Sequence, residues 1–326
     1  MRFALALLLA CPAFAVVEGV VLNETTGQAQ SGVDVLLVQP GAGGMKSLGS
    51  AKSGPTGLFK IDQDLPAGPA LLQSTYAGVT YTQALPPGSV TSGLRVNVYN
   101  STKQPPPEMI TQHLVLLEPT ATELHVSETF FTRNLSKLTF QDTENGSIRL
   151  YLPQGAPANL QVTIDSTGVP IRRPLEKGKQ AGAYKVGYPL KPGETRFDLE
   201  YSLPATATLS GKVFSTTPPT KLVTPAGVTL SGNGLTDLGE EPETKARVYT
   251  FTGDSYKVGI LGVGSIRPPA ADTGAPAEDT GAPKCCQEVP ARVNQQMPWV
   301  LGLGFGILLL GGTLLYRRGQ VGPSKA

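Results

Sequence analysis

The sequence predicts an all-β protein with two or three tandem antiparallel β-sandwich domains, a disordered Pro/Ala-rich stalk and one C-terminal transmembrane helix. Short runs rich in β-branched residues alternate with glycine and proline turns from residue 16 to residue 266. The composition then changes to Pro, Ala, Gly and Thr over residues 267–298. Residues 299–316 follow without a single charged side chain. These three observations predict the order of the segments along the chain.

The N-terminus has the features of a secretory signal peptide. Met1 and Arg2 precede an apolar stretch, and small residues flank Phe14, so residues 1–15 are expected to be removed on export. A second interpretation stays open, because Leu8-Leu9-Ala10-Cys11 resembles the lipobox of bacterial lipoproteins. In that case Cys11 would be lipidated and would become the first residue of the mature chain.

The first β domain is expected over residues 16–104. Glycine, proline and polar turn residues separate its β-branched runs, and runs at this spacing favour an antiparallel sandwich. The predicted strands are residues 17–22, 33–38, 57–61 and 94–99.

The same residues carry a resemblance to a known family. Gly19-Val20-Val21-Leu22-Asn23 and Thr26-Gly27 are followed by Ser31-Gly32-Val33-Asp34-Val35, Gly57-Leu58-Phe59-Lys60-Ile61 and Leu65-Pro66-Ala67-Gly68. Residues 16–100 therefore resemble the bacterial carboxypeptidase regulatory-like domain. The resemblance implies a small transthyretin-like sandwich, grouped by fold with carbohydrate-binding modules, and implies no particular ligand. The pattern departs at Ser53–Gly57, where the family often has Asp-x-x-Gly.

A second β domain is expected over residues 105–204. Its clearest predicted strands are residues 113–117, 123–131, 148–152, 160–164 and 195–201. Residues 205–266 are also β-rich, with predicted strands at 210–214, 228–230, 246–251 and 256–260. They either complete the second domain or form a small third one.

The C-terminal part is expected to hold the chain in a membrane. Residues 267–298 are too poor in apolar side chains to fold, which predicts a semi-extended stalk. The 18 residues from Trp299 to Tyr316 span roughly 27 Å as a helix, enough for the bilayer core. Trp299 and Tyr316 suit the two interfaces, and Arg317 and Arg318 mark the cytoplasmic side, with residues 317–326 as a cytoplasmic tail.

Two alternatives to a retained membrane helix remain. One is a buried helix of a soluble domain, although the glycines and threonines of the segment make a poor soluble helix. Stalk, helix and arginines together also resemble C-terminal sorting tails, which processing enzymes remove. The favoured prediction is a single-pass membrane protein whose N-terminal domains lie in the periplasm or at the cell surface.

The sequence predicts no enzyme, no cofactor and no metal site. His125-x-x-Glu128 has the spacing of zinc carboxypeptidases, but no histidine follows it as a third ligand, and a strand would direct the two side chains to opposite faces. The Asp-Thr-Gly triplets at Asp272 and Asp279 lie in the expected stalk, which cannot hold two carboxylates rigidly. Lys and Arg number 27 against 25 Asp and Glu, without a basic run, so nucleic acid is not an expected partner.

Binding candidates are weak in the sequence. Tyr76, Tyr81 and Tyr99 could form a sugar platform, but tyrosine in a sandwich more often packs in the core. Asp62 and Asp64 could join a calcium site, but such a pair at a strand end is usually only solvated.

Adjacent cysteines suggest an intermolecular disulfide. Cys285 and Cys286 lie in the expected stalk and are too close in sequence for an unstrained intramolecular bond. They predict a disulfide-linked homodimer, against the alternative of free or capped thiols. Gly302 and Gly306 would give the membrane helix a compatible close-approach face.

These features together lead to a functional expectation. We expect a non-catalytic, membrane-anchored envelope protein whose β-sandwich domains have structural, adhesive or ligand-binding roles, with a protein or carbohydrate partner. The alternative is an accessory subunit of a membrane enzyme or transport complex.

Overall fold

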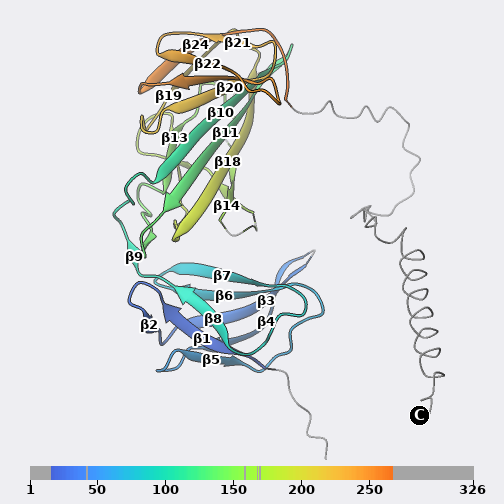
Figure 1. The fold of residues 1–326 in the computed structure, drawn as a ribbon, viewed down its shortest axis with the longest axis vertical. Helices are drawn as coiled ribbons and strands as arrows, with labels where there is room; N and C mark the ends of the chain where they lie inside the picture. The colour runs from blue at the N-terminus through green and yellow to red at the C-terminus, as the bar shows by residue number, and fades with distance from the viewer. Residues whose placement is uncertain (1–15, 42, 158, 167, 169, 267–326) are drawn as a thin grey trace, which may run out of the picture. The chain divides into compact units, whose positions relative to one another are not determined.

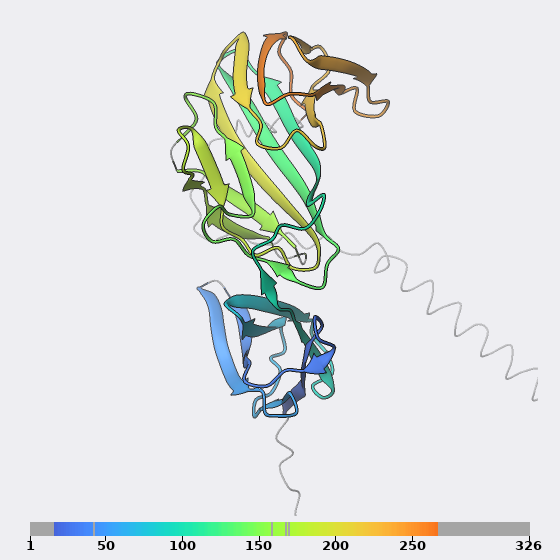
Figure 2. The ribbon, with the colours of Figure 1, turned by 90° about the vertical axis from the view of Figure 1, so that its left-hand side faces the viewer.

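The computed structural model describes residues 16–41, 43–157, 159–166, 168 and 170–266. These residues belong to one compact unit and contain strands, turns and loops but no helix (Figures 1 and 2). The prediction of an all-β fold is confirmed. We call residues 16–104 the N-terminal β region and residues 105–266 the second β region.

The N-terminal β region contains two four-stranded sheets. In the first sheet, β1 (Val17–Asn23) pairs antiparallel with β2 (Gln28–Ala29) and β5 (Leu58–Ile61), and parallel with β8 (Leu94–Val98). The second sheet is antiparallel in the order β4 (Gly44–Lys52), β3 (Asp34–Gly41), β6 (Ala70–Tyr76) and β7 (Val79–Leu85). Alternate residues of both sheets, such as Val21, Leu37 and Leu72, form one buried core.

The parallel pairing of β1 with β8 explains one glycine of the sequence pattern. A methyl group at Gly19 would lie 2.2 Å from the carbonyl oxygen of Leu94, well inside van der Waals contact. Gly57 is constrained in a second way, because its φ is +75° and a methyl group there would lie 2.8 Å from the carbonyl oxygen of Val21. Both glycines therefore allow backbones to approach closely.

The second β region is built on an eight-stranded sheet. All its neighbouring strands are antiparallel except β10 and β20. In sheet order the strands are β15 (Ile171–Pro174), β14 (Gln161–Asp165), β18 (Gly193–Pro204), β11 (Glu123–Asn134), β10 (Ile110–Pro119), β20 (Thr220–Thr224), β23 (Arg247–Phe251) and β22 (Leu235–Glu240). Strands from residues 105–204 and from residues 205–266 thus share one sheet.

Two three-stranded sheets contribute to the same core as the large sheet. One has the order β13 (Ile148–Tyr151), β17 (Ala183–Val186), β16 (Glu176–Lys177), and the other β19 (Thr208–Lys212), β24 (Ser255–Leu261), β21 (Thr229–Ser231). Ile148, Val258 and Leu230 from these sheets pack in one cluster with Val126 and Phe197 of the large sheet. A two-stranded parallel pair of β9 (Ser101–Thr102) and β12 (Thr139–Phe140) completes the structure.

The described part of the chain ends beside the middle of the large sheet. The Oε1 atom of Glu118, at the end of β10, accepts hydrogen bonds from Ser265 Oγ and Ile266 N, each at 2.7 Å. The Gly264 amide donates to the Pro119 carbonyl at 2.9 Å. Residues 264–266 are therefore attached to the end of a central strand.

The predicted strands at 17–22, 113–117 and 123–131 coincide with β1, β10 and β11, with ends that differ by a few residues. The sequence does not predict strands β4, β6, β7, β15, β17, β20 and β22, nor the two-residue strands β2, β9, β12 and β16. Among the described residues no helix is long and apolar enough to cross a membrane. The predicted signal peptide, stalk and helix, with Cys285, Cys286, Gly302, Gly306, Trp299, Tyr316, Arg317 and Arg318, lie outside the described residues.

Candidate functional site

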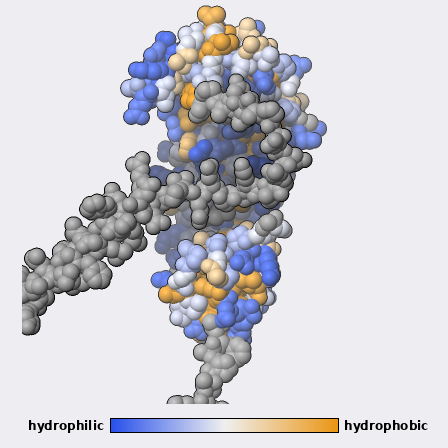
Figure 3. Space-filling model, turned by 90° about the vertical axis from the view of Figure 1, so that its right-hand side faces the viewer, coloured by the Kyte–Doolittle hydropathy of each residue, from blue (hydrophilic) through white to orange (hydrophobic). Residues whose placement is uncertain are grey.

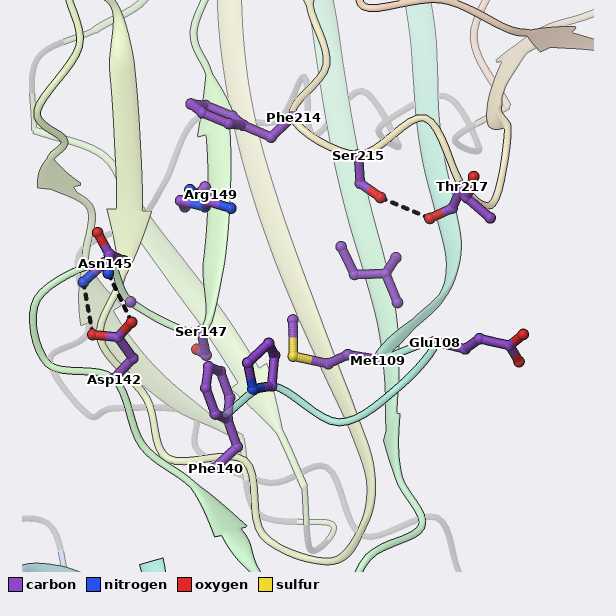
Figure 4. A pocket seen from close by; sticks show the side chains of 13 residues that line it. Glu108, Met109, Phe140, Asp142, Asn145, Ser147, Arg149, Phe214, Ser215 and Thr217 are labelled. Atoms are coloured by element: carbon purple, nitrogen blue, oxygen red, sulfur yellow. Dashed lines mark hydrogen bonds between the residues drawn. The ribbon is translucent and has the colours of Figure 1, made fainter. Parts of the chain in front are cut away.

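Three segments that are distant in sequence line a cavity of about 390 Å³ in the second β region (Figure 4). They are residues 105–110, 140–149 and 214–217. In the view of Figure 4, Met109 and Phe140 lie on one side, Phe214 lies on the other, and Arg149 lies between them. The cavity therefore combines an apolar wall with a cation.

Strand alternation places two cations and two aromatic rings side by side, and one of each, Arg149 and Phe214, lines this cavity. In β13, Ile148 and Leu150 enter the core, so Arg149 and Tyr151 both point outward. Lys212 ends β19, and Phe214 lies two residues further on. Two cation-x-aromatic sequences thus meet where β13 and β19 are in contact.

The four side chains form a stacked array. The Tyr151 and Phe214 rings are parallel within 7°, with centroids 4.5 Å apart. The Arg149 guanidinium carbon lies 5.2 Å from the Phe214 centroid, and Lys212 Nζ lies 5.3 Å from the Tyr151 centroid. Both distances are within the range of cation–π attraction. This attraction orients the Arg149 guanidinium without using its N–H donors.

Nearby carboxylates are engaged with groups other than Arg149. Asp142 accepts hydrogen bonds from the amides of Glu144 and Asn145 and, at 2.8 Å, from Asn145 Nδ2. These hydrogen bonds, above all the one from the Asn145 side chain, lower the pKa of the Asp142 carboxyl. Glu144 pairs with Lys179, whose hydrogen bond lowers the pKa of that carboxyl. Within the part of the chain that the structure describes, the Arg149 side chain makes no hydrogen bond or ion pair.

A buried polar group lies behind the cavity. His113, Glu128 and Thr220 come from the neighbouring strands β10, β11 and β20, and their exposed fractions are 7%, 7% and 1%. The distance from His113 Nε2 to Glu128 Oε1 is 2.7 Å, and that from His113 Nδ1 to Thr220 Oγ1 is 3.0 Å. The imidazole also stacks on Phe130 at 4.1 Å. A small recess lined by His113 and Glu128 shares Arg149 and Phe214 with the cavity.

The connectivity of hydroxyl, imidazole and carboxylate is that of a nucleophilic triad, but its position does not suit catalysis. A nucleophile must reach its substrate, and the Thr220 side chain is enclosed in the core. Burial raises the pKa of the Tyr201 and Tyr256 phenols, and the Glu128 charge adds to that effect. We conclude that this polar group contributes to the interior of the second β region.

The structure separates the His125-x-x-Glu128 pair. Glu128 points into the core toward His113, whereas His125 lies on the half-exposed face, with Nδ1 2.8 Å from Ser202 Oγ. The two side chains therefore lie on opposite faces of β11. Among the described residues, no group of three histidine, cysteine or acidic side chains is placed to hold a metal ion.

The tyrosines considered for sugar binding make internal contacts. The Tyr81 hydroxyl donates to the Tyr99 carbonyl at 3.0 Å and lies 2.9 Å from Thr139 Oγ1. Tyr76 donates to the Asn100 side chain at 3.1 Å. Of the two aspartates considered for calcium, Asp62 pairs with Lys60 at 3.1 Å.

Apart from its cavities, the described surface exposes scattered apolar side chains. On the visible part of the face in Figure 3, hydrophobic residues appear in small groups among hydrophilic ones. Leu58, Val90, Leu261 and Val263 are examples of exposed apolar side chains. Small separated groups of this kind are usual on a protein surface.

Sequence reasoning missed Arg149, Tyr151, Lys212 and Phe214. The available signal was the repeated cation-x-aromatic pattern at 149–151 and 212–214. The sequence does not show that these two segments meet.

Comparison with known proteins does not assign a family. No family model matches the chain, and no curated protein matches it. Among solved structures, one match is the M1 zinc metallopeptidase from Deinococcus radiodurans, with 13% sequence identity and a TM-score of 0.25. The match covers 46% of this chain and 42% of the peptidase, and a likeness of this size supports no conclusion about fold or activity.

Proposed function

We propose that this chain is a non-catalytic, membrane-anchored envelope protein whose extracytoplasmic β-sandwich domains bind a ligand. The observation that carries this proposal is the Arg149 guanidinium, oriented over Phe214 in a cavity of about 390 Å³ with its N–H donors unused by other described residues. A preformed cavity with a few oriented polar groups is the usual form of a ligand site. Arginine in such a place favours an anionic group.

The domain organisation is part of the same proposal. Residues 16–104 form a carboxypeptidase regulatory-like sandwich and residues 105–266 form a second sandwich, followed by a stalk and a membrane helix at residues 299–316. The close backbone approaches at Gly19 and Gly57 support the first assignment, because both glycines belong to the sequence pattern that resembles the family. The export features, the uncharged segment and Arg317-Arg318 support an extracytoplasmic location for the N-terminal regions.

The proposal is tested by ligand-induced stabilisation of the full chain in detergent micelles. A panel of peptides and oligosaccharides is screened for a raised melting temperature, and hits are repeated with Arg149→Gln and Arg173→Gln. Arg173 is an exposed arginine on the edge strand β15 and serves as the matched control. Stabilisation should disappear in Arg149→Gln and persist in Arg173→Gln. Stabilisation that persists in both variants would exclude this cavity as the binding site.

Cross-linking in native membranes separates this role from that of an accessory subunit. Recovery of a stoichiometric integral-membrane enzyme would favour the accessory subunit, whereas glycan or surface-protein partners would support the proposed role.

We also propose a homodimer linked through Cys285 and Cys286, with Gly302 and Gly306 on the facing sides of the membrane helices. Non-reducing electrophoresis should show a dimer that reductant converts to monomer. The double variant Cys285→Ser, Cys286→Ser should migrate as monomer under both conditions. A wild-type monomer band unaffected by reductant would contradict the dimer.

A further inference from the structure

We infer that the cavity around Arg149 binds the C-terminal carboxylate of a protein partner whose last side chain is apolar. This inference rests on the proposed ligand-binding function and names its ligand class. Four properties of the cavity carry it: the geometry of the arginine, the local charge, the hydrogen bonds of the polar lining and the apolar wall.

The first property is the arginine itself. The guanidinium is planar, and its N–H groups point outward in its own plane. Phe214 contacts the guanidinium over the aromatic ring, at 5.2 Å from the centroid. A guanidinium held over a ring in this way still has N–H groups free for two parallel hydrogen bonds, which is the geometry that a carboxylate accepts.

The second property is the charge around the arginine. Glu108 and Asp142 also line the cavity, and hydrogen bonds lower the pKa of the Asp142 carboxyl, so this group is ionised at neutral pH. Two nearby negative charges would repel a phosphate dianion more strongly than a carboxylate monoanion. These two lining carboxylates therefore disfavour a doubly charged ligand.

The third property is that the polar lining already has internal partners. Ser147 Oγ donates to the Val186 carbonyl at 3.0 Å, and Ser215 Oγ donates to the Thr217 carbonyl at 2.7 Å. Asn145 Nδ2 donates to Asp142. A carbohydrate presents many hydroxyl groups, which would need hydrogen-bond partners on burial. The lining offers few free hydrogen-bond partners. A uronic-acid polysaccharide, which also carries carboxylates, therefore suits this cavity less well than a peptide terminus.

The fourth property is an apolar wall beside the cation. Pro105, Met109, Ile110 and Phe140 line the cavity together. Apolar side chains at this wall would accept the last side chain of a peptide while its carboxylate contacts Arg149. The volume, about 390 Å³, is near the lower end of ligand sites. It suits a chain terminus, and capture of a terminal carboxylate is an established mode of peptide recognition.

The test compares two peptides that differ only at the terminal group. Fluorescein-labelled Gly-Gly-Gly-Ala-Leu is prepared with a free carboxylate and as its C-terminal amide, and each is titrated with the purified full chain by fluorescence anisotropy. We expect the carboxylate form to bind at least roughly tenfold more tightly, as one charge-assisted bidentate contact implies. Arg149→Gln should remove this preference and Arg173→Gln should keep it. Arg149→Lys retains the positive charge but cannot donate two parallel hydrogen bonds, so it should keep only part of the preference for the carboxylate peptide.

The outcomes distinguish the inference from the proposed function. Equal binding of carboxylate and amide, or a preference that survives Arg149→Gln, would overturn the inference. Arg149-dependent binding of an oligoglucuronate without binding of the peptide would also overturn it, and the proposed function would stand. If no peptide or oligosaccharide shows Arg149-dependent binding, both are refuted. Far-UV circular dichroism and urea midpoints of all variants exclude loss of folding as the cause.

Discussion

Replacing His113 by leucine should destabilise the second β region by about 3 kcal/mol. The imidazole contacts Glu128 at 2.7 Å and Thr220 at 3.0 Å inside the core. Leucine preserves the apolar volume beside Phe130, so little of the expected loss comes from packing. The cost arises because the Glu128 carboxylate, with an exposed fraction of 7%, would lose its hydrogen-bond partner.

A double substitution gives the decisive comparison. When His113→Leu is combined with Glu128→Leu, both members of this buried polar pair are removed, and replacement of such a pair by apolar residues is often neutral or stabilising. Thr220 Oγ1 loses its imidazole partner in both variants, so we expect the double variant to recover most of the loss and to stay about 1 kcal/mol below the wild type. The coupling free energy between the two positions should exceed about 2 kcal/mol.

The free energy of unfolding is measured in urea by far-UV circular dichroism on the full chain in micelles. Hydrogen exchange resolved to peptides of β10 and β11 assigns the change to the second β region. His125→Leu is the matched control, because His125 is half-exposed and its ring nitrogens face the side chains of Ser202 and Glu123, so its effect should stay below about 1 kcal/mol. Additive losses in the double variant would refute the argument that the two side chains stabilise the core by satisfying each other's hydrogen bonds.

Three further predictions concern other sites. Burial lowers the pKa of Lys191 to about 8 from 10.5, so the unfolded chain binds more protons and the free energy of unfolding should rise between pH 8 and pH 10.5. Lys191→Met should abolish this rise and stabilise the protein at pH 7 by up to about 3 kcal/mol, which urea midpoints at both ends of the range would show. Gly19→Ala should lower the free energy of unfolding by at least about 2 kcal/mol, because the added methyl group would lie 2.2 Å from the Leu94 carbonyl oxygen. Gly43→Ala, which has open space around the added methyl group, should be nearly neutral in the same urea titration. Phe214→Ala should weaken carboxylate-peptide binding roughly three- to tenfold by releasing the guanidinium, and unchanged anisotropy titrations would contradict the role of the stack.

The fold class could be predicted from the sequence because period-two alternation is strong in the central strands. In β11 every second side chain from Leu124 to Asn134 is buried, and the apolar residues among them stand out in the sequence. Strand β4 has no such pattern, since its residues are mostly glycine, serine and lysine and none of them is fully buried. Strand β20 is short and is bounded by prolines, and only its pairing with β10 and β23 makes it a strand.

The candidate site was less predictable than the fold. Arg149 and Phe214 lie on segments whose contact depends on how β13 and β19 are positioned in the folded chain. His113 and Glu128 were visible as residues, but their pairing requires the register in which Val115 lies opposite Glu128. Local sequence patterns predict which face of a strand a residue occupies. They do not predict which strands become neighbours.

The attachment of residues 264–266 to the end of β10 has a mechanical consequence. The N-terminal β region joins the second β region ahead of Ile110, at one end of this strand, while Ser265 and Ile266 are bonded to Glu118 at the other end. Tension applied between residues 104 and 266 would therefore run along the length of β10. The hydrogen bonds of β10 to β11 and β20 lie across that direction, so they would be loaded together in shear rather than broken one after another. Such a strand resists extension better than a hairpin pulled open from one end.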